Sequence, residues 1–262
     1  MLLVIDIGNT NTVVGIFENE KLLFDFRLGT VQGKTSDELR VNLNEFLHLN
    51  NLKKEDIEDV ILASVVPNLI YSWQSAVKKF FGKKPLVVGE GTKTGMEIKC
   101  ENPKEVGADR IVNAVAAYEK YKGPLIVVDL GTATTFDVIN EKGQYLGGPI
   151  APGIKISAEA LFLRTAKLPK IELHTPKRAI EKNTPESMNS GIVYGYIGLI
   201  DGIIKKVIEE LEEKGEDIVK LNIVSTGGYS YLLAKSSEYI NIVDRDITLE
   251  GLRIIYDRTV KK

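Results

Sequence analysis

The chain contains an internal repeat that restricts it to a small set of folds. Residues 2–12 (LLVIDIGNTNT) and 125–135 (LIVVDLGTATT) align without a gap. Each begins with four aliphatic residues, continues with Asp, an aliphatic residue and Gly, and ends in a mostly polar run. In both copies further apolar segments follow, which predicts a three-strand antiparallel meander and then a helix. In the second copy the third strand is expected at residues 144–150. A repeat that spans about half the chain indicates a duplicated α/β domain with a cleft between the copies.

The chain length of 262 residues is sufficient for two such domains. No linker rich in Pro, Gly or Ser separates the two copies. We therefore expect a first lobe at residues 1–116 and a second at residues 117–262, joined directly.

The charge balance and cysteine content exclude several classes of function. Lys and Arg total 34 against 36 Asp and Glu, so there is no broad electrostatic attraction to nucleic acid or to an anionic membrane. The single cysteine, Cys100, rules out a disulfide framework, and no Cys/His cluster is present to hold zinc. The first residues, MLLVIDIGNT, lack a basic leader and turn polar early, so we expect no signal peptide. A cytoplasmic protein that acts on a small molecule is the expectation.

The two Asp-x-Gly turns carry groups that suit a polyphosphate. Gly8 and Gly131 let a phosphate approach the backbone, the neighbouring hydroxyl groups donate hydrogen bonds, and Asp6 and Asp129 can hold cations nearby. Two such turns facing one cleft could hold the phosphates of a nucleotide from both sides. This arrangement is similar to that of the actin, Hsp70 and sugar kinase group, which consists of duplicated ribonuclease H-like domains with an interdomain nucleotide cleft.

Two other segments are candidates for ligand contacts. Gly227-Gly228 follows an apolar segment and would let a ribose or a flat ring approach the backbone, although a simple turn between strand and helix is the alternative. Asp109 and Arg110 fall in the first turn of a predicted helix. There an Asp is commonly a partner of the helix dipole, whereas an Arg beside a cleft suits an anionic substrate. The Walker-like run Gly29–Thr35 is one residue short, so we interpret it as a connection in which Thr35 caps a helix.

Four motifs in order resemble the type III pantothenate kinase family. They are Asp6–Thr12, Gly107–Arg110, Asp129–Thr132 and Ser225–Gly228. The resemblance extends over essentially the whole chain. It implies an enzyme that transfers the γ-phosphoryl group of ATP to the hydroxyl group of pantothenate, the first step of coenzyme A biosynthesis.

The resemblance also implies a role for each motif residue. The residues expected to contact ATP are Asp6, Ile7, Gly8, Asn9, Thr10, Asn11, Thr12, Val13 and Thr132, to which the turn adds Gly227 and Gly228. Asp6 is expected to bind Mg²⁺, and Asp129 a monovalent cation, K⁺ or NH₄⁺. The residues expected to bind pantothenate are Gly107, Ala108, Asp109, Arg110 and Thr184. Among these, Asp109 is expected to be the catalytic base.

Two alternative functions stay open at this point. One is a non-catalytic regulatory relative on the same scaffold, and the other is a kinase for another small hydroxylated acid. A degenerate regulator is expected to lack a motif Asp or the Asp109-Arg110 pair, and this chain has all of them. One departure from the family pattern is Cys100, at a position that is often aromatic in the family.

A run of glycines predicts contact with a second copy of the chain. Gly191, Gly195, Gly198 and Gly202 recur at spacings of four, three and four in a long predicted helix. A glycine inside a helix costs about 1 kcal/mol relative to Ala, so close approach of another helix is the expected compensation. We expect a homodimer, with packing inside the chain as the alternative.

Overall fold

The computed structural model describes residues 1–89 and 91–260. The chain divides into two compact units. The first comprises Met1–Gly95, Asn102–Ala116 and Asp246–Lys262, and the second comprises Met96–Glu101 and Ala117–Arg245. Both units are discontinuous in sequence, whereas the expected lobes 1–116 and 117–262 are continuous. Within the described residues, no helix combines the length and the apolar character that crossing a membrane requires.

The first unit is built on a five-stranded mixed sheet with the strand order β3-β2-β1-β4-β5. Its strands are β1 (Leu2–Ile7), β2 (Asn11–Glu18), β3 (Lys21–Gly29), β4 (Asp59–Ser64) and β5 (Leu86–Val87). The first three strands form the antiparallel meander, and β4 and β5 add in parallel. The helical segments are α1 (Ser36–Leu49), η1 (Lys54–Asp56), α2 (Pro67–Phe81), η2 (Pro103–Glu105), the first half of α3 (Ala108–Tyr121) and α7 (Ile247–Val260).

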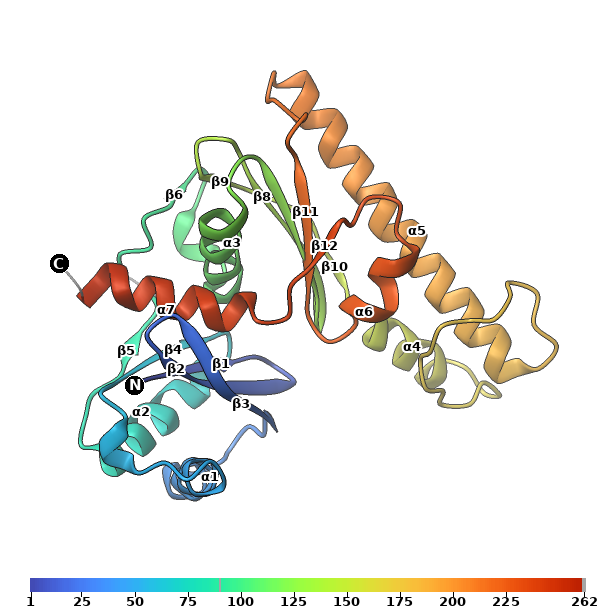
Figure 1. Ribbon diagram of the computed structural model, residues 1–262. Helices are drawn as coiled ribbons and strands as arrows, with labels where there is room; N and C mark the ends of the chain where they lie inside the picture. The colour runs from blue at the N-terminus through green and yellow to red at the C-terminus, as the bar shows by residue number, and fades with distance from the viewer. Residues whose placement is uncertain (90, 261–262) are drawn as a thin grey trace. The chain divides into compact units, whose positions relative to one another are not determined.

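The second unit is built on a larger sheet with the strand order β12-β11-β7-β8-β9-β6. Its strands are β6 (Glu97–Ile98), β7 (Leu125–Leu130), β8 (Ala133–Ile139), β9 (Gln144–Gly147), β10 (Ile150–Pro152), β11 (Asn222–Thr226) and β12 (Ile242–Val243). The helical segments are the end of α3, then α4 (Ile154–Leu163), α5 (Thr184–Glu213), α6 (Ser230–Leu233) and η3 (Ala234–Ser236). In Figure 1, α5 is the long orange helix of this unit.

The two sheets share one topology. The path β9-β8-β7-β11-β12 repeats the order and the strand directions of β3-β2-β1-β4-β5, and β6 is an addition at the edge. The predicted duplicated ribonuclease H-like architecture is therefore confirmed. The aliphatic half of each repeat forms the central strand β1 or β7, whose residues are mostly buried.

Helices cover the sheet faces through apolar side chains. In the first unit, α1 and α2 bury Leu43 and Trp73 against one face of the sheet. As expected from the sequence, Thr35 caps α1 in a capping box with Glu38. In the second unit, α5 packs on β7 and β11 through residues that include Val193 and Ile200.

The third strand of the second meander is shorter than the sequence predicts. We expected one strand over residues 144–150, but β9 ends at Gly147 and β10 begins at Ile150 and pairs with β8. Gly147 and Gly148 have positive φ angles of 96° and 148°. A side chain at Gly148 would collide with the carbonyl group of Phe136. The backbone therefore turns at these glycines, and the continuous strand was wrong.

Candidate active site

The first hairpin tip, residues 8–11, is a tight turn between β1 and β2. The Gly8 N–H donates to the Asn11 carbonyl oxygen at 3.0 Å, which closes the turn. A Cβ atom at Gly8 would lie 2.9 Å from that oxygen, so the turn favours glycine. Asn9 and Thr10 are exposed at the apex. The Thr30 N–H donates to the Thr10 carbonyl oxygen at 2.9 Å, which anchors the apex to the end of β3.

The register of this hairpin separates its polar side chains onto two faces. Asp6 lies opposite Val13, whereas Thr12 lies opposite Ile7, which is fully buried in the core. The Thr12 hydroxyl is itself buried and lies 3.0 Å from the hydroxyl of Thr30. The side chains of Asp6 and Thr12 therefore point to opposite faces, and a contact between Thr12 and a ligand at the apex would use the backbone.

The second hairpin tip, residues 131–133, is one residue shorter than the first but is also closed by a hydrogen bond from the glycine N–H. The Gly131 N–H donates to the Ala133 carbonyl oxygen at 3.1 Å, and Thr132 is exposed at the apex. The Gly153 N–H donates to the Thr132 carbonyl oxygen at 3.1 Å. A Cβ atom at Gly153 would come within 2.2 Å of the same oxygen, so the start of α4 supports this apex from very close range.

Tyr196 ties α5 to the second tip. Its hydroxyl lies 2.7 Å from the Thr134 hydroxyl and also donates to the Pro152 carbonyl oxygen. Burial raises the pKa of Tyr196, so its hydroxyl stays protonated and available as a donor. The long helix thus holds the second hairpin in place.

Asp129 lies against the Gly227 turn of the same unit. A Cβ atom at Gly227 would come within 2.6 Å of Asp129 Oδ1 and 2.7 Å of the Leu130 carbonyl oxygen. Gly227 also has a positive φ of 89°, which favours glycine. Gly228 is exposed, and nothing lies within 4 Å of a Cβ atom placed there. The structure therefore brings Asp129, Gly131 and the Gly-Gly turn together, and it leaves the backbone of Gly228 open to a ligand.

Asp109 occupies the first turn of α3, as expected. Its Oδ1 accepts the Arg110 N–H at 2.8 Å and folds back toward Gly107, where a Cβ atom would lie 2.6 Å away. Burial raises the pKa of Asp109, and this effect outweighs the opposing hydrogen bond and charge of Arg110. Such a carboxylate holds a proton more readily than an exposed one, which suits a general base.

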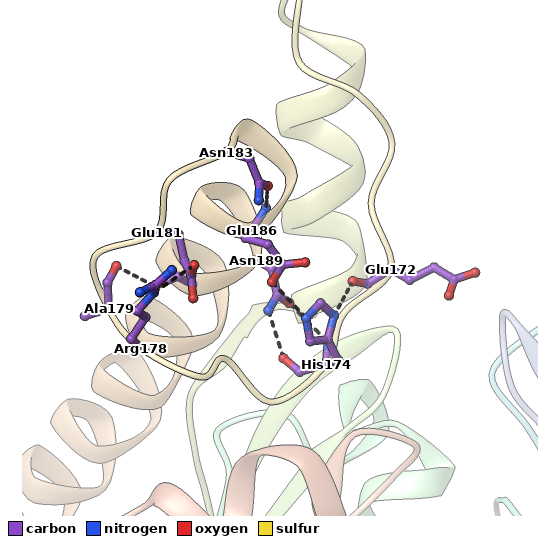
Figure 2. A network of polar contacts seen from close by, with 9 residues as sticks. Glu172, His174, Arg178, Ala179, Glu181, Asn183, Glu186 and Asn189 are labelled. Atoms are coloured by element: carbon purple, nitrogen blue, oxygen red, sulfur yellow. Dashed lines mark hydrogen bonds and ion pairs between the residues drawn. The ribbon is translucent and has the colours of Figure 1, made fainter.

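A polar network surrounds the start of α5 (Figure 2). Thr184 is the first residue of this helix. Asn183 caps the helix by accepting the Glu186 N–H at 2.9 Å. The buried Asn189 amide exchanges two hydrogen bonds with the backbone of His174, at 3.0 and 3.1 Å. The His174 ring lies 3.0 Å from Glu186, a contact that the sequence pattern did not predict.

The surroundings of Thr184 differ from those of the second tip. An open hollow of about 750 Å³ lies beside Thr184 and is lined by Leu161 of α4 and Gly191 of α5. Tyr196 contacts the tip twelve residues after Thr184, which corresponds to about 18 Å along the helix. Thr184 is therefore not brought to the second tip of its own chain.

The oxygen donors of both tips suit hard cations. No group of three or more His, Cys, Asp or Glu side chains that could hold a metal ion occurs among the described residues. A Mg²⁺ ion that is bound together with a nucleotide needs only one or two carboxylates, because phosphate oxygens and water complete its shell. Asp6, beside the first tip, fits that requirement. Asp129, packed on the glycine turn, offers a carboxylate to a second cation.

Sequence reasoning missed two buried polar groups. Asp137 is fully buried on β8, two residues from Thr135, and accepts the Tyr145 hydroxyl at 2.8 Å. Asn113 is fully buried on α3 and accepts the Thr248 hydroxyl at 2.7 Å. A polar residue inside an apolar strand or helix face was the only available signal, and it does not identify the partner.

The fold and the paired tips define the class of protein. Repeated sheets, each with an Asp-x-Gly turn at the end of its central strand, are the fold of the group that contains actin, Hsp70 and the sugar kinases. Two solved structures support this fold. One is the ethanolamine utilization protein EutJ from Carboxydothermus hydrogenoformans, with 15% identity, a TM-score of 0.54 and coverage of 97% of this chain and 89% of that one. The other is the activator of 2-hydroxyisocaproyl-CoA dehydratase from Clostridium difficile, solved with bound ADPNP, with 13% identity, a TM-score of 0.50 and coverage of 98% and 94%.

Sequence comparison identifies the family within that class. The family model for type III pantothenate kinase matches residues 2–206. The type III pantothenate kinase of Finegoldia magna is 54% identical over 257 residues, which are 98% of this chain and 97% of that protein. The chain belongs to the type III pantothenate kinase family, and the resemblance noted in the four motifs is confirmed.

The burial of Asp109 makes a prediction about stability. Because its pKa is raised in the folded chain, the native state binds a proton more tightly than the unfolded state, and stability falls as pH rises through that range. Asp109→Asn removes the buried charge and should raise the Tm at pH 7 by roughly 1–4 °C. At pH 3, where both states are protonated, the difference should vanish. Thermal unfolding of both chains measures it.

Asp25→Asn, at an exposed carboxylate on β3, is the matched control and should leave the Tm unchanged. If Asp109→Asn melted at a lower temperature at pH 7, Asp109 would instead be an ordinary stabilising acid of a helix first turn.

Proposed function

We propose that the protein transfers the γ-phosphoryl group of ATP to the hydroxyl group of pantothenate and so forms 4′-phosphopantothenate, with Asp109 as the general base. Family membership supports the reaction class. The observation that carries the mechanism is the position of the Asp109 carboxylate, which lies beside Arg110 in the first turn of α3, where burial also raises its pKa. We expect the enzyme to act in the cytoplasm, as the composition suggests.

The ATP contacts are assigned to the two tips and the Gly-Gly turn. Residues 6–13 and Thr132 would hold the phosphates through backbone N–H groups and hydroxyls, and Gly227-Gly228 would lie on the adenosine side. The exposed apex residues and the open backbone of Gly228 support this assignment. When bound, Mg²⁺ neutralises charge on the transferring phosphoryl group, and Asp6 is the residue that would hold it.

Pantothenate is assigned to residues 107–110 and to Thr184. The Arg110 guanidinium would pair with the pantothenate carboxylate, because Arg forms strong charge-assisted hydrogen bonds with that group. Asp109 would accept the proton from the attacking hydroxyl. The new O–P bond forms as the bond between the γ-phosphorus and the ADP oxygen breaks, and Asp109 then releases its proton to water.

The alternative functions are less well supported. A regulator without activity has no need for a buried carboxylate beside an Arg, and burial without function would only lower stability. A kinase for another small hydroxylated acid would use the same groups, so substrate tests must separate it from a pantothenate kinase.

Asp109→Asn tests the mechanism. The variant is nearly isosteric and keeps the acceptor oxygen for the Arg110 N–H, so folding and ATP affinity should persist. Without a base, kcat should fall at least about 100-fold in a coupled assay of ADP release with pantothenate. The Asp25→Asn control should retain the wild-type kcat. Near wild-type turnover by Asp109→Asn would require a different base.

From the position of Asp129 we predict that a monovalent cation activates the enzyme. A carboxylate beside the polyphosphate repels it unless a countercharge intervenes. With Mg²⁺ held constant, rates in K⁺ or NH₄⁺ should exceed those in buffer that contains only Na⁺. Asp129→Asn should reduce the dependence on the cation. Equal rates in all three salts would contradict this assignment.

The glycine stripe, Gly191, Gly195, Gly198 and Gly202, supports a homodimer. All four glycines are exposed, and a Cβ atom at any of them would meet no atom within 4 Å. Packing on another part of the described chain therefore does not explain them. Exposed apolar side chains occur on the same helix at Tyr194 and at the end of α4 at Phe162 and Leu163.

Light scattering at micromolar concentration should give about twice the 29.0 kDa chain mass. Gly198→Gln should lower that mass toward the monomer without unfolding the chain, because the site has room for the added side chain. Lys235→Gln, at an exposed position outside the stripe, is the control and should remain dimeric. A monomeric mass for the wild-type chain would contradict the dimer.

A further inference from the structure

The first half of α7 contacts the hairpin that carries Asp6. A Cβ atom at Gly15 would lie 3.0 Å from Leu249 Cδ1 and 3.2 Å from Val4 Cγ2. Gly15 is paired with Val4, and residues two apart on a strand share a face, so Leu249 packs on the face that carries Asp6. The helix thus touches the sheet on the same side as this carboxylate.

The next residues of α7 press against α3. A Cβ atom at Gly251 would lie 2.2 Å from the Val112 carbonyl oxygen, so the two helix backbones approach closely at that point. Gly251 and Val112 are both buried. Glycine inside a helix is less favourable than Ala, and the close approach accounts for its presence here.

A buried hydrogen bond joins the same two helices. Thr248 Oγ1 donates to Asn113 Oδ1 at 2.7 Å, and Asn113 has an exposed fraction of 0%. A buried amide oxygen needs a donor, so loss of this contact is costly. Asn113 is one turn after Asp109, on the same face of α3. The hydrogen bond therefore fixes the part of α3 that carries the base.

We propose that Thr248, Asn113 and Gly251 are positioning residues that set the Asp109 carboxylate relative to the end of β1. The proposal rests on the proposed function of Asp109. One rigid helix, α7, packs on β1 and β4 and on the first turns of α3 (Figure 1). It therefore determines how far the base lies from the residue assigned to Mg²⁺. A misplacement of about 1 Å can reduce the rate of an aligned reaction up to about 100-fold.

Thr248→Val is the main test because it removes the donor and keeps the shape of the side chain. We expect kcat to fall at least about 10-fold, while KM for ATP stays near the wild-type value because the tip itself is intact. Thr248→Ser retains the donor and should restore kcat. Thr259→Val is the control near the other end of α7, where the Thr259 hydroxyl donates to the Ile255 carbonyl oxygen of its own helix and accepts the Lys93 N–H.

A second readout does not depend on turnover. In chains with ¹³C-labelled Asp carboxyls, the Asp109 resonance is assigned by its loss in Asp109→Asn and is then titrated. Release of the α3 start should expose the carboxylate, so Thr248→Val should lower the Asp109 pKa toward its ordinary value, and Thr248→Ser should not.

The outcomes separate the two proposals. Wild-type kcat together with an unchanged Asp109 pKa in Thr248→Val would overturn the positioning role, as would a loss that serine fails to restore. Failure of the wild-type chain to phosphorylate pantothenate would instead overturn the proposed function, and the titration would still report how Asp109 is held.

Discussion

Each half of the molecule is organised around a hairpin whose tip is closed by a single main-chain hydrogen bond, from Gly8 to Asn11 in one unit and from Gly131 to Ala133 in the other. The bond fixes the register of the two strands, and the register decides which face each side chain occupies. An Asp two positions before the glycine therefore always lies beside the turn. A shift of one residue would move Asp6 into the apolar core under α1 and α2. The chemistry assigned to the tips depends on this constraint.

Asp109, the proposed base, is subject to a different constraint, because it is held by helix packing rather than by a sheet. Asp109 lies in a helix first turn, where a carboxylate normally stabilises the helix, but its burial works against ionisation. A less stable ionised carboxylate is also a stronger proton acceptor. Stability and reactivity thus conflict at this residue, as they commonly do at active sites. The close contact between Gly251 and Val112 stabilises the surrounding packing.

Much of the fold could be predicted because the repeat is local in sequence. The aligned strand–Asp-x-Gly segments predicted both meanders, whereas the full strand order of each sheet is given only by the structure. The cap at Thr35 could also be predicted from the sequence. The sequence did not predict the break between β9 and β10, because the break depends on the close approach of Gly148 to Phe136, a contact that is not local in sequence. The contact between the Thr12 and Thr30 hydroxyls could not be predicted either, because it depends on the strand register.

The candidate site was predictable to the same degree. The motif residues lie where tight turns and helix starts were expected, because those features depend on glycine and on capping within a few positions. The partners of Asn113 and Asn189 lie 135 and 15 residues away, and no local pattern indicates them. The sequence likewise does not show that the glycine stripe is open. The structure shows it, because α5 buries its other face in the core.

The measurement that tests the account most directly is ADP release by the wild-type chain with Mg²⁺, K⁺ and ATP, compared with and without pantothenate and with pantoate as a second hydroxylated acid. The account predicts rapid release only with pantothenate, with one 4′-phosphopantothenate formed for each ADP by mass spectrometry. ADP release that is unaffected by pantothenate, or faster with pantoate, would contradict it.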